Sequence, residues 1–178
     1  MSKIKLNAAS GGGSVAFEGA ASSSSDKVIK FPAAPGVIVQ VISVSTTQTA
    51  TSTSTSWSTT GFQTDITPTS TSSKILIQCS GPMTGFAGGS THQRGGLKLY
   101  RGGSGGTSVE GSANGLSCQY SGDSTYSDVH LLWWDAPATT SAITYTIMMS
   151  RRGGSGTYSF IRDGNQTGSL VLMEVAGL

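Results

Sequence analysis

The segment Val37-Ile-Val-Gln-Val-Ile-Ser-Val-Ser45 decides the fold class, because its side chains follow a period of two. Positions of odd number, starting with Val37, share one face of an extended chain and end in serines, while positions of even number take the other face. Such alternation is typical of a half-buried strand that enters a polar stretch. The chain is therefore expected to be built from strands at this point.

Downstream of this strand, further segments are rich in β-branched and aromatic residues and are bounded by glycine and proline turn signals such as Gly81-Pro82. The predicted strands are Ser56–Ile66, Lys74–Cys79, Gln93–Arg101, Leu116–Tyr120, Val129–Trp134, Ala142–Ser150, Thr157–Asp163 and Ser169–Val175. No strand-helix-strand alternation is present. The pattern predicts an all-β domain over residues 36–178, an antiparallel β-sandwich or jelly roll.

Composition limits the partners of the chain. Its 178 residues allow one core, only 11% of them are charged, and the net charge is +2. So small a charge predicts no binding to nucleic acid. No segment has the length of apolar sequence that a membrane span needs, and the first residues lack the apolar region of a signal peptide. We therefore expect synthesis in a cytoplasm and no membrane partner.

Residues 1–35 form a region of different character. Two short apolar patches, Ile4–Leu6 and Val15–Phe17, are separated by glycine and serine and cannot bury a core of their own. A disordered tail is one interpretation. The other is an extended N-terminal attachment arm that becomes ordered on a partner by adding to the edge of its sheet. The predicted partner-binding residues of the arm are Ile4, Leu6, Val15 and Phe17.

A search for catalytic groups finds no constellation. His92 and His130 have no evident acidic partner, and the glycine cluster near residue 104 joins two predicted strands and opens no helix. A glycosidase would need two facing carboxyl groups, and only Asp65, Glu110 and Asp128 are left without another role. The sequence thus predicts a protein that is not an enzyme, with no catalytic residue, cofactor or metal site.

The run from Thr46 to Thr60 consists almost entirely of threonine and serine. A regular threonine array could bind ice or sugar. The favoured interpretation is structural: a solvated, hydroxyl-rich strand that protects a sheet edge from aggregation or pairs with another copy.

Trp133 and Trp134 are adjacent in a predicted strand, so their rings must point to opposite faces. One ring can fill the core, and the other can serve a subunit interface or act as a ligand platform for sugar. Glu174, beside Leu172 and Val175 in the last strand, is predicted to form a hydrogen bond or ion pair at a subunit contact. The candidate partners of Glu174 are Arg151, Arg152 and Arg162.

Several segments resemble small virion structural proteins of marine tailed phages, especially cyanophages. Lys3–Gly19 and Ser22–Pro32 are similar to the N-terminal arm of that group. Gly61–Ile77, Leu99–Gly103, Asp135–Pro137 with Tyr145 downstream, and Ser169–Val175 are similar to its β-domain, often labelled as fibre or appendage protein. The resemblance implies a trimeric virion component with a β-sandwich or jelly roll. Because different structural proteins reuse this arm, the position on the particle stays open.

These observations lead to one functional hypothesis with two alternatives. The chain is expected to be a structural protein of a tailed bacteriophage virion, a tail fibre or appendage subunit anchored by residues 1–35. The alternatives are a capsid decoration protein and a carbohydrate-binding receptor module for a host surface glycan. A core with few large apolar residues favours a homotrimer, because association buries further apolar faces. Cys79 and Cys118 are expected to stay reduced.

Overall fold

The structure, a computed structural model, describes residues 3–7, 14–18, 36–86, 93–121, 124–161 and 165–176. The chain divides into two units, Met1–Pro32 and Ala33–Leu178, and each is described by itself. In the first unit, β1 (Lys3–Asn7) and β2 (Ser14–Glu18) pair as an antiparallel hairpin. The second unit, the body, holds the remaining strands.

Two antiparallel sheets make up the body. Their strands are β3 (Val37–Thr46), β4 (Ala50–Ser52), β5 (Ser58–Ile66), β6 (Lys74–Phe86), β7 (Gln93–Arg101), β8 (Thr107–Ser108), β9 (Ser117–Ser121), β10 (Ser124–Asp135), β11 (Ile143–Gly153), β12 (Thr157–Phe160) and β13 (Gly168–Ala176). The first sheet has the order β3-β13-β6-β12-β4, with β10 also paired to β6. The second sheet has the order β5-β11-β7-β8, with β9 also paired to β7.

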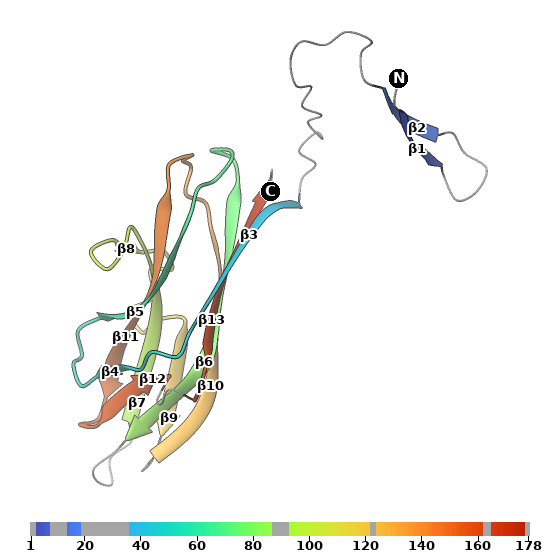
Figure 1. The fold of residues 1–178 in the computed structure, drawn as a ribbon. Coiled ribbons are helices and arrows are strands. Elements are labelled where there is room, and N and C mark those ends of the chain that lie inside the picture. The colour runs from blue at the N-terminus through green and yellow to red at the C-terminus, as the bar shows by residue number, and fades with distance from the viewer. Residues whose placement is uncertain are drawn as a thin grey trace. The chain divides into compact units, whose positions relative to one another are not determined.

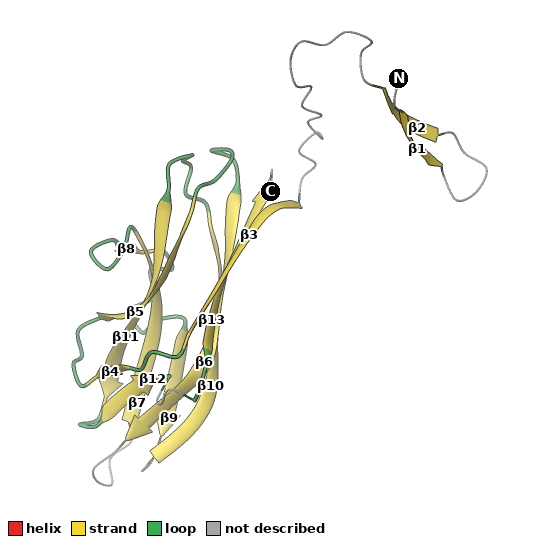
Figure 2. Cartoon of the chain, viewed as in Figure 1, coloured by secondary structure: helices red, strands yellow, loops and turns green. Residues whose placement is uncertain are grey.

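The pairing of the long strands is nested. The first strand of the body, β3, pairs with the last, β13, and Figure 1 shows them side by side. Inside that pair, β5 joins β11, β6 joins β10 and β7 joins β9, all antiparallel. This nesting across two packed sheets defines a jelly roll. The described residues contain strands and loops and no helix (Figure 2), so the predicted fold class is confirmed.

The core lies between the sheets and follows from the period of two. In β6, Ile75, Ile77 and Cys79 point inward and are buried, whereas the residues between them face outward. The same alternation continues in the neighbouring strands. The core is completed by Phe62, Ile66, Met83, Leu97, Leu99, Val129, Leu131, Ile143, Tyr145, Ile147, Met149, Tyr158, Phe160, Ile161, Leu170 and Leu172.

The prediction that Gly81-Pro82 ends a strand is wrong. Strand β6 runs through both residues to Phe86 while paired with β10. On its other side, the pairing with β13 ends at Ser80 and the pairing with β12 begins at Met83. Proline has no N–H to donate, and Pro82 lies at the junction between these two partners, where that loss matters least. The long β6 therefore holds two shorter strands in line.

The hydroxyl run from Thr46 to Thr60 does not form one continuous strand, which corrects that expectation. The run is divided among the end of β3, the short β4 and the start of β5. Between these strands, the hydroxyl of Ser52 accepts the backbone N–H of Ser54, and the hydroxyl of Ser54 accepts that of Ser56. Such local hydrogen bonds compete with strand pairing and break the ladder.

Candidate functional site

The two adjacent tryptophans of β10 divide as the alternation predicts. Trp133 is half-buried and packs against the core, whereas the ring of Trp134 is 45% exposed on the outer face. The register pairs Trp133 with Ile77 and Trp134 with Leu76 of β6. One strand thus presents an inner and an outer indole at neighbouring positions.

A hollow of about 250 Å³ lies at this part of β10. It is lined by Leu132, Trp133 and Trp134, so its wall is apolar. Because β10 pairs with β6 alone in its sheet, the hollow lies on an edge strand. This hollow can take an apolar group and offers little hydrogen bonding from side chains.

In the part of the body that the structure describes, the exposed large hydrophobic side chains lie on two strands. Those on β3 are Val37, Ile38, Val39 and Val41, and those on β10 are Tyr126, Leu132 and Trp134. Their exposed fractions range from 43% to 60%. Strands β3 and β10 are the two edges of the same stretch of sheet, β3-β13-β6-β10. Within the described residues, the large exposed apolar side chains therefore lie at the two edges of one sheet.

Glu174 forms the predicted hydrogen bonds, but it forms them inside the chain and not at a subunit contact. The residue is 0% exposed. Its carboxylate accepts bonds from Gln40 Nε2 at 2.6 Å and from both the backbone N–H and the hydroxyl of Thr69 at 2.7 Å. These donors join β3, β13 and the loop after β5. The carboxylate is satisfied within the chain, and Arg162, one predicted partner, lies outside the described residues.

The electrostatics of Glu174 follow from that environment. Burial alone would raise the pKa of its carboxyl group. The neighbouring Ser73 hydroxyl and the groups donated by Thr69 and Gln40 act in the opposite direction and lower the pKa below its usual range. Glu174 is thus a buried structural anion.

A second, partly buried network fixes the end of β10. Arg101 Nη1 lies 3.1 Å from both carboxylate oxygens of Asp135, and the hydroxyl of Tyr145 donates to Asp135 Oδ2 at 2.6 Å. Burial and the adjacent carboxylate raise the pKa of Tyr145, so this phenol stays protonated. Because Arg101 and Tyr145 belong to the second sheet, the network joins the two sheets beside the tryptophan pair.

A cluster that was not predicted from the sequence lies on the outer face of the second sheet. Lys98 Nζ lies 4.9 Å and Arg152 Cζ 5.2 Å from the ring centre of Trp57. Lys98 is only 8% exposed, and Arg152 also donates to the Thr55 carbonyl. In the sequence, Trp57 stands alone within the serine and threonine run, and this feature could have indicated the packing. These cation–π contacts hold the residues before β5 against the sheet.

The register of the hairpin places the four predicted arm residues. Ile4 is opposite Phe17, and Leu6 is opposite Val15. Directly opposed residues of an antiparallel pair share a face, so these four positions lie on one side of the hairpin. Within the hairpin, each apolar patch is thus paired with the other, and addition to the sheet of another chain stays a prediction. The rest of the arm, 19–35, lies outside the described residues.

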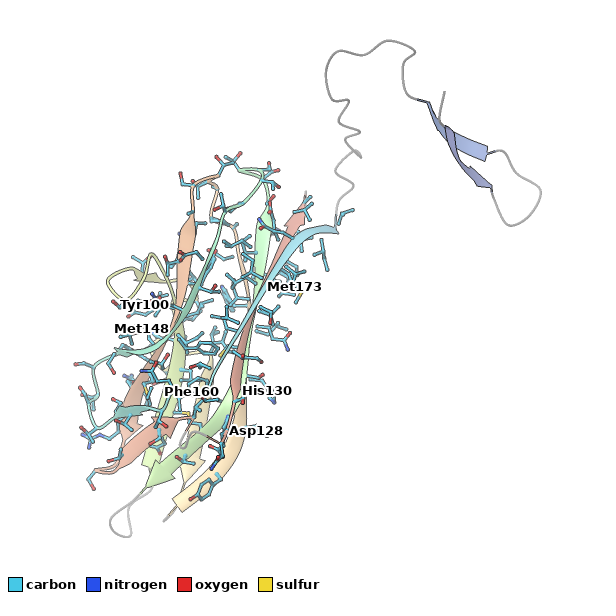
Figure 3. The ribbon with its side chains drawn as sticks, in the orientation of Figure 1. Tyr100, Asp128, His130, Met148, Phe160 and Met173 are labelled. Atoms are coloured by element: carbon cyan, nitrogen blue, oxygen red, sulfur yellow. The ribbon has the colours of Figure 1, made fainter. Side chains whose placement is uncertain are left out.

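The described residues form no catalytic constellation. His130 and Asp128 lie two positions apart on β10 (Figure 3), and His130 is opposite Ser80. Among the described residues, the hydroxyl of Ser80 is bonded to that of Ser169, and no hydrogen bond joins His130 to Ser80 or Asp128. Asp65 and Asp128 are on strands of different sheets. His92 lies outside the described residues. Where the chain is described, no cluster of three metal-binding side chains is found.

The same described residues contain no helix that could cross a membrane. No protein-family model and no curated protein matches the chain. Among solved structures, it is similar to a chain of infectious bursal disease virus, Gx strain, at 16% identity and a TM-score of 0.40, covering 79% of this chain and 33% of that one. The corresponding values for the VP2 subviral particle of the same virus are 16%, 0.31, 75% and 37%. The chain spans about a third of the length of these proteins.

Proposed function

We propose that the chain is a non-enzymatic structural subunit of a tailed bacteriophage virion, a tail fibre or appendage protein. In this proposal the arm, residues 1–35, attaches the subunit to another virion protein, and the jelly-roll body assembles as a homotrimer. This proposal depends on one observation: among the described residues, the exposed large hydrophobic side chains all lie on the two edge strands β3 and β10. Large exposed apolar clusters on a soluble domain indicate association surfaces.

The hairpin supports an attachment role. A two-stranded hairpin is marginally stable by itself in water, and one with four apolar positions on one side gains stability when another surface covers that side. The division of the chain into two units separates this hairpin from the body. The arm therefore has the features of a segment that binds a partner, while the body carries the self-association.

A carbohydrate-binding receptor module is the weaker candidate. The exposed ring of Trp134 could stack on a sugar, and it borders the hollow at β10. Sugars, however, also require polar groups that fix their hydroxyls, and the three side chains lining the hollow are all apolar. We expect no binding to a glycan array. Binding that is lost in Trp134→Ala, with the fold intact, would favour the receptor module.

The position on the particle is tested by copy number. In purified particles of the phage that encodes the chain, quantitative gel staining should give tens of copies or fewer, as for a tail component. Hundreds of copies would instead support a capsid decoration protein. Absence of the chain from purified particles would contradict a virion role altogether.

The attachment role is tested by deleting residues 1–30. The truncated chain should keep the circular dichroism spectrum and the oligomeric state of the full chain but fail to join particles. Normal incorporation would show that the arm is not the attachment segment. Light scattering of the full chain should give three times the mass of one chain, 18.1 kDa; a monomer at micromolar concentration would contradict the homotrimer.

A further inference from the structure

One exposed apolar residue on each edge, Trp134 of β10 and Val41 of β3, lies at the same level of one sheet. The register aligns Trp134 of β10 with Leu76, Leu76 with Met173, and Met173 with Val41 of β3. One transverse row therefore runs from edge to edge and contains no charged side chain. It begins at an exposed tryptophan and ends at an exposed valine.

Cyclic symmetry makes this alignment significant. Rotation about a symmetry axis moves a subunit around that axis without displacing it along the axis. Two different patches can meet around a ring only if they lie at the same level, as Trp134 and Val41 do when the strands run along the axis. The strand directions also agree: β3, β13, β6 and β10 alternate, so β10 of one copy beside β3 of the next continues the antiparallel order.

The edge of β10 is suited to such a contact. Soluble proteins protect edge strands with lysine, proline or bulges. The segment Leu131-Leu-Trp-Trp134 has none of these, and its hollow of about 250 Å³ can receive a branched apolar side chain. The register of β3 with β13 shifts beside Val39, so the edge formed by β3 is irregular. We therefore expect side-chain packing, and not a regular ladder of backbone hydrogen bonds, to make the contact.

We infer that copies of this chain join edge to edge, the hollow at Leu132, Trp133 and Trp134 of one copy receiving Val41 of the next. The inference rests on the proposed homotrimer and specifies its interface as heterologous, with different surfaces on the two sides. Neither surface brings a charge into the centre of the contact, so no ion has to be desolvated there.

The available area favours a closed ring over an open pair. Edge strands of ten and twelve residues are about 34 to 41 Å long, and at about 10 Å depth each edge offers roughly 350 to 400 Å². This is about half of the roughly 800 Å² per partner in a standard interface. A ring uses both edges of every copy, whereas a dimer leaves one apolar edge exposed on each.

Cysteine cross-linking tests the contact without altering its apolar centre. Ser45 and His130 are exposed on the two edges and share a transverse row through Ser169 and Ser80. The double variant Ser45→Cys/His130→Cys is treated with a short bismaleimide and compared with each single variant and with the unchanged chain. We expect covalent trimers from the double variant only, on a denaturing gel.

Each of the other outcomes contradicts either the edge-to-edge contact or the homotrimer. Covalent dimers from His130→Cys alone would show that β10 meets β10, which overturns the heterologous contact. No added cross-links in the double variant, while light scattering still gives three chains, would overturn the edge contact and leave the homotrimer standing. One chain by light scattering would overturn the homotrimer itself.

An affinity measurement gives a second test. Val41→Asp should raise the concentration at which the assembly dissociates by about tenfold or more, because it places an unpaired charge in the contact. The matched control is Thr107→Asp, an exposed position on the short β8 of the other sheet, which should change nothing. Equal dissociation of both variants would overturn the inference.

Discussion

The outer faces of the two sheets have opposite environments. On the second sheet, outward-facing Thr146, Met148 and Lys98 are buried, and Trp57 packs beside Lys98. On the first sheet, outward-facing Val41 and Trp134 are exposed, although they are equally apolar or more so. The chain uses its own segments to cover one outer face and leaves the edges of the other open.

This difference separates two uses of apolar side chains. Where the chain covers its own sheet, the buried residues stabilise the monomer, and their loss should appear in the free energy of unfolding. Where the sheet is open, apolar residues contribute little until another copy or a partner arrives. Substitutions can therefore distinguish folding residues from association residues.

The largest effect is expected at Glu174, whose side chain points inward from the first sheet. Glu174→Ala leaves the backbone N–H and the hydroxyl of Thr69 without an acceptor and leaves the Gln40 amide only its bond to the Thr67 carbonyl, which should lower the free energy of unfolding by about 3 kcal/mol. Urea unfolding monitored by circular dichroism measures this. A loss below about 0.5 kcal/mol would mean that the network contributes little.

The same residue predicts an acid dependence. Because the pKa of Glu174 is lowered in the folded state, its contribution is complete above the ordinary carboxyl range and is lost as the pH falls through the lowered folded-state value. The unchanged chain should therefore lose stability on acidification more steeply than Glu174→Gln does. Parallel pH profiles for the two chains would contradict this.

The adjacent tryptophans give the sharpest paired test. Trp133→Ala should cost about 2 kcal/mol of unfolding free energy, because the half-buried ring packs against the core. Trp134→Ala should stay within about 0.5 kcal/mol for the dissociated chain, because its ring is exposed there. Both are measured at concentrations where light scattering shows monomers. Equal losses would contradict the assignment of Trp133 to folding and Trp134 to association.

A smaller effect is expected where the second sheet is covered. A Cβ at Gly96 would lie 2.7 Å from the carbonyl oxygen of Asn114 and 3.1 Å from the Trp57 ring, so Gly96→Ala must displace this covering layer. We expect a cost of about 1 to 2 kcal/mol in thermal unfolding. Gly105→Ala, where a Cβ meets nothing within 4 Å, is the matched control and should be neutral.

The smallest effect concerns the thiols. Cys79 is buried and free, and burial raises its pKa to about 12, so its thiol should resist labelling in the folded chain. The side chain of Cys118 lies outside the described residues. We still predict no disulfide between the two, and a melting temperature that reductant leaves unchanged. A large fall on adding reductant would contradict this.

Local periodicity was sufficient to predict strands whose bounds do not depend on where their partner strands begin and end. The bounds of β7, Gln93–Arg101, agree with the prediction. The length of β6 was not predictable, because continuing through Pro82 depends on where β13 ends and β12 begins, which are contacts distant in sequence. Hydroxyl side chains in the run before Trp57 bonded to their own backbone, a competition that residue type alone does not decide.

For the candidate site, the alternation of Trp133 and Trp134 was predictable because it is a property of any strand. The surroundings of Glu174 were not, because its donors come from β3 and from the loop after β5. A carboxylate in an apolar strand can be satisfied by a neighbouring copy or by its own chain. Only the three-dimensional arrangement decides between them.

The pairing of β3 with β13 also has a consequence for synthesis on the ribosome. About 120 residues separate Thr46 from its partner Gly168, so at roughly 5 to 20 residues per second β3 waits about 6 to 24 s before its partner strand exists. During that interval β3 has no partner strand, and its inward-facing Ile42 and Val44 cannot yet be held against the core. Closure over so long a loop also slows folding. Contact between nascent chains during that interval would therefore compete with the correct closure of β3 on β13.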